Sequence, residues 1–379
     1  MAARFMTPIK RNGVIASLVT ALAITVPNPA AGQDEPDFTL DGLLRTGLRL
    51  ESARYDGVKG FDIYDARLGL SGRVGIVFDY ALRAEYHFAD DAVRLIDARL
   101  SLPLRDEILR LDAGLVMAGF GREAMKPKDI LSFVERSQGS LALAPGRQVG
   151  AALRGAAFEE RLHYWGGLYN GEGATFGNED RKFLYAMRAE YNSVGEIEFF
   201  EDFVFEVGAN LAFASDSANP VLPVSVSAGD AESPGATVPA FVEYTGDRFA
   251  WSADAGIRYR NWSLATEYAK AEYDPTGDAE EVTSEAWFVQ GGYTLWGAFD
   301  LLARFDSFLP AAGLGVEPDR TEFLVFGFKL NPGFHATIGL QYALGIDDAL
   351  VGVPRSIDRT NTGPALADKQ FMLNLQLAF

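Results

Sequence analysis

Five basic side chains gather in and beside one long segment of the chain that lacks strand periodicity, residues 118–146. They are Arg122, Lys126, Lys128 and Arg136 within the segment and Arg147 at its exit. Fixed positive charge at a narrow aqueous passage attracts anions, and the guanidinium fork of arginine matches the geometry of oxyanions. Glu123, Asp129 and Glu135 dilute this charge. The segment is therefore either a constriction that filters anions or a solvated loop.

A second basic group recurs at one parity of the first six extended segments, where alternate side chains face the same side. Its members are Arg45, Arg49, Arg67, Arg73, Arg83, Arg99, Arg110 and Arg154. Side by side, they would form an arginine-rich wall facing the segment 118–146. The same parity also carries the acids Asp65, Asp79, Glu85, Asp97 and Asp112. A network of opposite charges lining any water-filled interior is the alternative, and only an excess of positive charge would make the wall selective.

The sequence contains no clear constellation for catalysis, metal binding or a cofactor. There is no cysteine, and His87, His163 and His335 lie far apart on different expected strands, so no zinc site is expected. The stretch 119–124 fits the loose dinucleotide pattern G-x-G-x-x-A, but Pro127 interrupts the place where the following helix should run. No G-x-S-x-G elbow is present. The sequence predicts no enzyme, no bound metal and no cofactor.

The first 32 residues have the order of a secretory signal peptide. Arg4, Lys10 and Arg11 give a positive start, an apolar run covers residues 14–26, and small residues follow at positions 30–32. The run is too short to cross a bilayer as a helix. A chance apolar run in a disordered N-terminus is the alternative. We expect residues 1–32 to be a cleaved signal peptide and residues 33–379 to form one domain.

Composition agrees with a membrane protein that crosses the bilayer with strands. Hydrophobic residues make up 48% of the 379 residues and the mean hydropathy is zero. Such neutrality is expected when half of each strand faces lipid and the other half faces water. The formal net charge of -18 argues against binding nucleic acid through its phosphates.

The strongest pattern along the chain is alternation at period two over segments of about ten residues. In residues 78–88, Phe78, Tyr80 and Leu82 share one parity, whereas Asp79 and Arg83 share the other. A helix would scatter these charges around its circumference, but a strand places them on one side. A soluble antiparallel sandwich is the alternative. The length of the segments and the aromatic residues near their ends favour a membrane barrel.

The lengths of the extended segments and their connections predict an all-β fold, a transmembrane antiparallel β-barrel of about 16 strands. We expect strands at 38–52, 61–73, 77–88, 93–103, 106–117, 147–158, 161–170, 182–191, 202–214, 248–259, 261–273, 285–296, 298–309, 321–331, 334–345 and 369–379. Tight turns alternate with long connections, of which 118–146 is the third. The segment 238–246 also has strand character, and we place it inside the large loop 215–247 because a further wall strand would spoil the alternation.

The last strand ends in an aromatic residue. In the stretch KQFMLNLQLAF, alternate residues up to Phe379 are apolar, and the polar residues Gln370, Asn374 and Gln376 share the other parity. A terminal aromatic on such a strand resembles the signal that the barrel-assembly machinery reads on outer-membrane proteins. We therefore expect Phe379 to act as an assembly signal.

Several stretches resemble the phosphate-selective porin O and P family. They occur in the family's order and are GFGREAMKPKDILSFVERS at 119–137, PGRQVGAALRG at 145–155, GLYNGEG at 167–173, AWFVQGGYTL at 286–295 and LLARFDSF at 301–308. The resemblance implies a sixteen-stranded trimeric porin of the Gram-negative outer membrane. In it the third long loop folds into the lumen, and arginines line a path for anions such as phosphate.

The interpretation as a porin implies a set of partners and leaves two alternative functions open. The partners are outer-membrane lipid and lipopolysaccharide, the barrel-assembly machinery, two further copies of the chain and small anions. A general porin, or one for another nutrient, with little selectivity is the first alternative. A barrel acting as an enzyme or adhesin is the second, and it would need a catalytic constellation or an outer domain that the sequence does not contain.

Overall fold

The computed structural model describes most of the expected barrel domain. The described residues are 38–51, 59–74, 78–87, 92–105, 108–174, 177–178, 180–193, 202–227, 237–312, 318–333, 335–346 and 369–379. Thr39–Phe379 forms one compact unit. The expected signal peptide, residues 1–32, lies outside the described residues.

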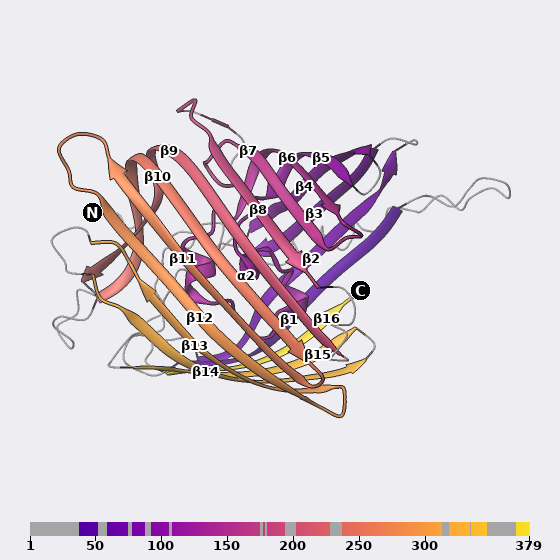
Figure 1. Ribbon diagram of the computed structural model, residues 1–379. Coiled ribbons are helices and arrows are strands. Elements are labelled where there is room, and N and C mark those ends of the chain that lie inside the picture. The colour runs from indigo at the N-terminus through magenta and orange to yellow at the C-terminus, as the bar shows by residue number, and fades with distance from the viewer. Residues whose placement is uncertain are drawn as a thin grey trace, which may run out of the picture. The chain divides into compact units, whose positions relative to one another are not determined.

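Sixteen strands make up the described part of the barrel (Figure 1). The first eight are β1 (Phe38–Glu51), β2 (Lys59–Val74), β3 (Phe78–His87), β4 (Ala92–Arg105), β5 (Leu109–Met117), β6 (Arg147–Ala157), β7 (Leu162–Tyr169) and β8 (Leu184–Asn192). The second eight are β9 (Phe203–Ser227), β10 (Thr237–Tyr259), β11 (Trp262–Pro275), β12 (Val282–Leu295), β13 (Phe299–Leu309), β14 (Thr321–Gly333), β15 (Ala336–Gly345) and β16 (Lys369–Ala378). The three short helices of this part, α2 (Arg122–Met125), η1 (Lys128–Ile130) and α3 (Gln138–Ala142), all lie between β5 and β6.

The sheet closes on itself. Each strand pairs with its neighbours in sequence, and β1 pairs antiparallel with β16, from Leu43 opposite Ala378 to Glu51 opposite Gln370. Closure removes the unpaired edges that a strand cannot expose to lipid. This topology confirms the sixteen-stranded antiparallel barrel and excludes the soluble sandwich. None of the helices in the described residues is long and apolar enough to span a membrane.

The alternation seen in the sequence separates an apolar outer face from a charged inner one. Outward side chains such as Leu211, Leu301 and Phe326 are 44%, 45% and 51% exposed, as suits contact with lipid. Inward side chains include Arg188 and Asp254, which are buried and form an ion pair with each other at 2.5 Å. The charged residues therefore gather inside the barrel, which is the reverse of a soluble protein.

The placement of 238–246 inside a loop is wrong. This segment belongs to β10, which pairs with β9 from Thr237 opposite Ser227 to Tyr259 opposite Phe203. It adds no further wall strand, because it lengthens a strand already counted, and the alternation of the wall is kept. The pairing of β10 with β9 shifts register between Val242 and Glu243 and between Tyr244 and Gly246. Such β-bulges bend a strand.

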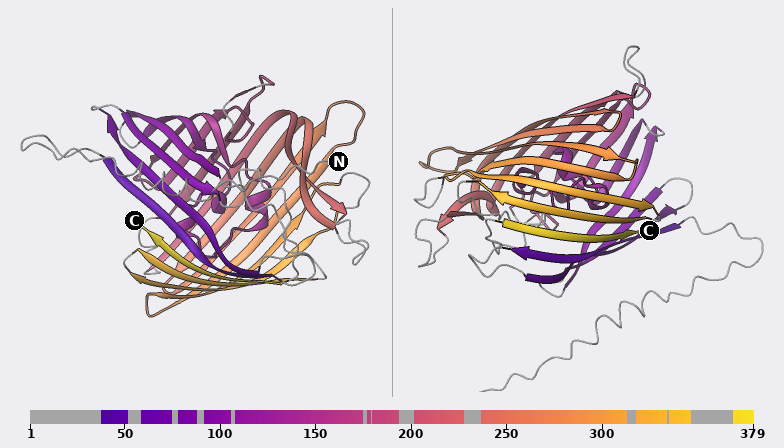
Figure 2. Two further views of the ribbon diagram at one scale, coloured as in Figure 1. Left: turned by 180° about the vertical axis from the view of Figure 1, so that it is seen from behind. Right: turned by 90° about the horizontal axis from the view of Figure 1, so that it is seen from below.

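The lengthened β9–β10 hairpin bends over the ends of the neighbouring strands (Figure 2). Val224 forms a bridge with Ala311, just beyond β13, and the Ala311 N–H donates to the carbonyl of Pro223 at 2.8 Å. Tyr244 packs edge-on against Tyr273 of β11, with ring centroids 5.4 Å apart. Tyr244 and Tyr273 are buried in one apolar cluster that also includes Ala142 of α3. The hairpin therefore covers the barrel mouth on the side of β11 to β13.

Candidate functional site

The segment 118–146, here named the lumen loop, crosses the inside of the barrel, as expected for the third long connection. Its backbone contacts inward side chains of six strands far from its own ends. The strand residues are Asn210 of β9, Glu267 of β11, Asp306 of β13, Lys329 of β14, Gln341 of β15 and Arg45 of β1. Such contacts require the loop to lie in the lumen, since these side chains point inward. Figure 1 shows α2 enclosed by the strands.

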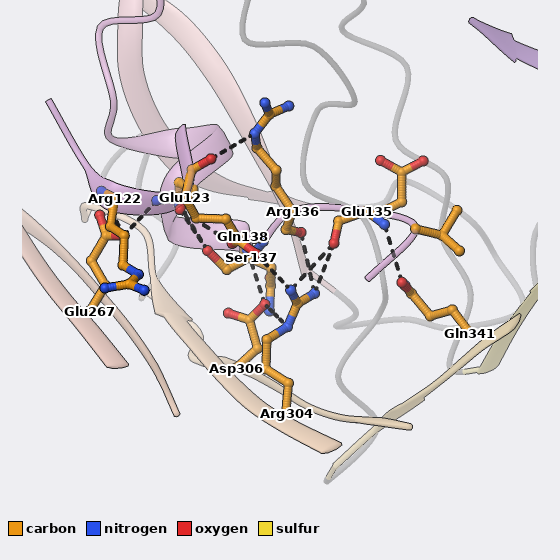
Figure 3. A network of polar contacts seen from close by, with 12 residues as sticks. Arg122, Glu123, Glu135, Arg136, Ser137, Gln138, Glu267, Arg304, Asp306 and Gln341 are labelled. Carbon is orange, nitrogen blue, oxygen red and sulfur yellow. Dashed lines mark hydrogen bonds and ion pairs between the residues drawn. The ribbon is translucent and has the colours of Figure 1, made fainter. Parts of the chain in front are cut away.

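Three buried carboxylates hold the backbone of the lumen loop (Figure 3). Glu267 accepts the N–H groups of Arg122 and Glu123 at 3.1 and 3.2 Å. Asp306 accepts the N–H of Gln138 at 3.0 Å, where α3 begins. The side chain of Glu123 in turn accepts the N–H of Ser137 at 2.6 Å. Short helices leave most of their N–H groups without an internal partner, so these acids satisfy donors that water would otherwise reach.

Arg304 of β13 is the cation at the centre of this network (Figure 3). Its Nη1 lies 3.3 Å from Oε1 of Glu123, and the guanidinium donates to the carbonyls of Glu135 and Arg136. Its central carbon lies 4.6 Å from the ring centre of Phe133. Arg304 is not among the site residues predicted from the sequence. Within the expected strand 298–309, Arg304 lies on the same face as Asp300 and Asp306, and this alternation would have indicated that its side chain points inward.

Three of the five predicted constriction residues are engaged in holding the lumen loop. Arg122 forms an ion pair with Glu206 of β9, and Lys128 forms one with Asp65 of β2. Arg136 donates to the carbonyl oxygens of Glu123, at 3.0 Å, and of Lys126. Their charges are therefore partly or wholly committed to contacts within the protein.

Lys126 and Arg147 differ from these three. Within the described part of the chain, neither forms an ion pair with a carboxylate. Burial and the neighbouring Arg122 guanidinium lower the pKa of the Lys126 ammonium from its usual value. The nearby carboxylates of Glu123, Glu206 and Glu190 offset this lowering only in part.

The eight arginines predicted as a wall, here named the arginine wall, face the lumen, and each has an acidic partner. The pairs are Arg45–Asp65, Arg49–Glu135, Arg67–Glu85, Arg73–Asp79, Arg83–Asp41, Arg99–Asp112, Arg110–Asp79 and Arg154–Asp112. Several acids serve more than one base: Asp65 also pairs with Arg67 and Lys128. Arg49 also pairs with Glu51 and Asp62, and Arg83 also pairs with Asp97, so the carboxylates that contact the arginine wall balance its charge.

Two cavities lie on either side of the lumen loop. The wall cavity, of about 460 Å³, runs along the arginine wall, and eight basic side chains line it against four aspartates. The opposite cavity, of about 660 Å³, lies along β8 to β14. Met125, Lys126 and Pro127 of the loop border both, as does Trp165 of β7. The two spaces therefore share this part of their lining. Trp165 lies opposite the inward Arg154 in the sheet, and it is not among the site residues predicted from the sequence.

No grouping of three histidine, aspartate or glutamate side chains suited to a metal ion occurs among the described residues. The carboxylates inside the barrel are instead paired with arginine or hold backbone N–H groups. The lumen is thus built as a charged aqueous passage narrowed by a loop. A closed sixteen-stranded barrel with an apolar outer face and such a lumen defines an outer-membrane porin, which is a channel.

Comparison with known proteins gives the family. The model of the phosphate-selective porin O and P family matches residues 46–315, and the chain belongs to this family. No curated protein matches the sequence. The location that this family and this fold define is the outer membrane of the cell.

Solved porin structures share the fold at low sequence identity. OmpT of Vibrio cholerae, in its trimer form, is 12% identical with a TM-score of 0.61, over 91% of this chain and 100% of that one. An anion-selective porin from Comamonas acidovorans has the same identity, TM-score and coverage. OmpF of Salmonella typhi is 12% identical with a TM-score of 0.58, over 90% of this chain and 97% of that one. At such identity the likeness extends to the fold alone.

Proposed function

We propose that this porin passes small anions, phosphate among them, between the lumen loop and the arginine wall. The observation that carries the proposal is the excess of basic side chains around the wall cavity, in a chain whose formal net charge is -18. Unpaired Lys126 and Arg147 border this cavity. In a narrow passage with walls of low dielectric constant, such charges act strongly on a permeating ion.

The family and one relative support the sign of the selectivity. The family's name refers to phosphate, and the porin from Comamonas acidovorans is described as anion-selective. Guanidinium groups at the wall cavity suit an oxyanion, because each can donate two parallel hydrogen bonds to it. The arginines that are paired with carboxylates also keep their positive charge at any physiological pH.

The reversal potential across a planar bilayer with a potassium chloride gradient tests the proposal. We expect its sign to show that chloride passes more readily than potassium, and we expect added phosphate to reduce the chloride current. A reversal potential of the opposite sign would overturn the anion filter, although the barrel would still be a porin.

A weakly selective general porin is the second candidate. The observation in its favour is the acidic partner of every member of the arginine wall, because paired charges act on a passing ion mainly as dipoles. The same measurement separates the two: a reversal potential near zero, with no effect of phosphate, would favour the general porin.

We further propose that the porin is a homotrimer held in outer-membrane lipid and lipopolysaccharide. The trimer form of OmpT from Vibrio cholerae supports the assembly. Native mass measurement in mild detergent should give three times the mass of the single chain, and a monomer alone would contradict the proposal. Crosslinking within intact membranes provides a second measurement that does not depend on the detergent.

A further inference from the structure

An apolar patch lies inside the lumen, on the opposite cavity. Ile130 of the lumen loop is 58% exposed, and Met125, Pro127, Trp165 and Leu302 line the same cavity. Porin lumens are otherwise polar, and apolar surface left in water has an unfavourable free energy. An exposed apolar cluster of this kind is typical of a surface that binds something.

Two ammonium groups border the same patch. Lys126 lies on the lumen loop and Lys329 on β14, and neither forms an ion pair among the described residues. The Nζ of Lys329 donates to the carbonyl of Leu131 at 2.9 Å, which places the ammonium beside the loop. Each ammonium has further donors for a ligand.

The acidic side chains of the cavity already have partners. Glu190 pairs with Arg188, and Glu206 pairs with both Arg122 and Arg258. Asp300 accepts the hydroxyl of Thr294 at 2.6 Å. Five basic side chains line the cavity against these three acids, so its net charge is positive and the ligand should be an anion.

We propose that the opposite cavity binds aromatic carboxylates on their way through the pore. The ring would lie on Ile130 and Trp165, and the carboxylate would reach Lys126 or Lys329. The volume of about 660 Å³ lies within the range of small-molecule sites. The indole of Trp165 offers a face for stacking. Ile130, Leu302 and Lys329 border the opposite cavity but not the wall cavity.

This inference rests on the proposed anion selectivity and names a class of solute for it. The test uses the full-length porin in planar bilayers, with the block of the chloride current by benzoate, acetate and inorganic phosphate as the readout. Benzoate and acetate carry the same charge, so their difference reports the apolar patch. We expect half-block by benzoate at a concentration about tenfold lower than for acetate, because burial of one ring accounts for at least that ratio.

Two substitutions locate the site. Ile130→Asn and Trp165→Gln should each reduce the preference for benzoate over acetate severalfold, while Ile108→Asn should leave it unchanged. Ile108 is the matched control because it is 45% exposed and lies at the turn between β4 and β5, away from the cavity. The folded amount of each variant is checked by its heat-modifiable mobility, so that lost block is not mistaken for lost protein.

The outcomes separate this inference from the proposed function. Equal block by benzoate and acetate, or an unchanged preference in both variants, would overturn the aromatic site. An anion-selective reversal potential in the same experiments would leave the proposed anion path intact. A cation-selective reversal potential would overturn the proposed anion path itself. A benzoate preference lost in Ile130→Asn and Trp165→Gln but kept in Ile108→Asn would support the site.

Discussion

Arg304 of β13 and Glu123 of the lumen loop form a buried ion pair, with 3.3 Å between Nη1 and Oε1 across 181 residues of sequence. The pair joins the barrel wall to the element that narrows its lumen. Both side chains are nearly inaccessible to solvent, so neither charge can be left alone without a large desolvation cost. This contact, more than any property of the loop itself, should decide where the constriction lies.

Replacing Arg304 with methionine should release the lumen loop. The change leaves Glu123 and Asp306 buried without their cation, which costs about 3–5 kcal/mol, and detachment of the loop relieves this cost more easily than unfolding of the barrel. We expect a higher single-channel conductance and a noisier open current. Arg258→Met is the matched control. Arg258 is largely exposed, so its ion pair with Glu206 should contribute little to stability. An unchanged conductance in Arg304→Met would show that other contacts suffice to hold the loop.

Neutralising Lys126 and Arg147 together should weaken anion selectivity. A unit charge about 8 Å from a permeating ion contributes about 1 kcal/mol at an effective dielectric constant of about 40. Each substitution by glutamine should therefore lower the permeability to chloride roughly fivefold, and the ratio of chloride to potassium permeability by at least this factor. The measurement is the reversal potential in a salt gradient. The effect should shrink near 1 M salt, where the screening length falls to about 3 Å.

Two controls accompany this double variant. Arg161→Gln with Arg260→Gln removes the same charge from exposed positions at the turns beside β7 and β11 and should change the reversal potential little. Neutralising the exposed acids Asp278, Glu280 and Glu281 should likewise have a small effect, since bulk water screens them. If either control shifts selectivity as strongly as the lumen variant, the total charge of the protein, rather than the constriction, sets the selectivity.

A disulfide between positions 224 and 311 should form without changing the conductance. Val224 and Ala311 are bridge partners and fully buried, and the chain has no native cysteine to compete. Paired backbone positions of this kind lie within the range that a disulfide spans. Val224→Cys with Ala311→Cys would then fix the β9–β10 hairpin where the structure has it. A conductance that falls on oxidation and recovers on reduction would mean that the hairpin leaves the mouth in the open channel.

Substituting Phe379 by alanine should lower the amount of folded barrel in the outer membrane of cells. The backbone of Phe379 exchanges hydrogen bonds with Gly42 at 3.1 and 2.8 Å, and alanine keeps both. The ring is 62% exposed, so its removal tests recognition rather than packing. Phe326→Ala, which removes an outward ring that is 51% exposed on β14, is the control. Normal levels of the heat-modifiable form in Phe379→Ala would show that the ring is not part of the assembly signal.

The sequence by itself determined the strands, their number and the face on which each side chain lies. This was possible because the period of a strand is two and one face of each strand meets lipid, so a wrong register would place charges in the membrane. The lengthened β9–β10 hairpin escaped this rule. Beyond the membrane both faces of a strand meet water or protein, and the strand character of segment 238–246 did not show whether it was a further strand or a continuation of β10.

Only the tertiary structure decided which charges face one another. Glu123 and Arg304 are neighbours because the barrel closes and the lumen loop crosses it, and neither fact is encoded in the local pattern around either residue. The same closure assigned Lys128 to Asp65 and, as far as the described residues extend, left Lys126 and Arg147 without a carboxylate partner. Electrostatic interactions depend on distance in space, and a sequence supplies only distance along the chain. The residues that carry charge were therefore evident from the sequence, whereas those whose charge remains for a solute were not.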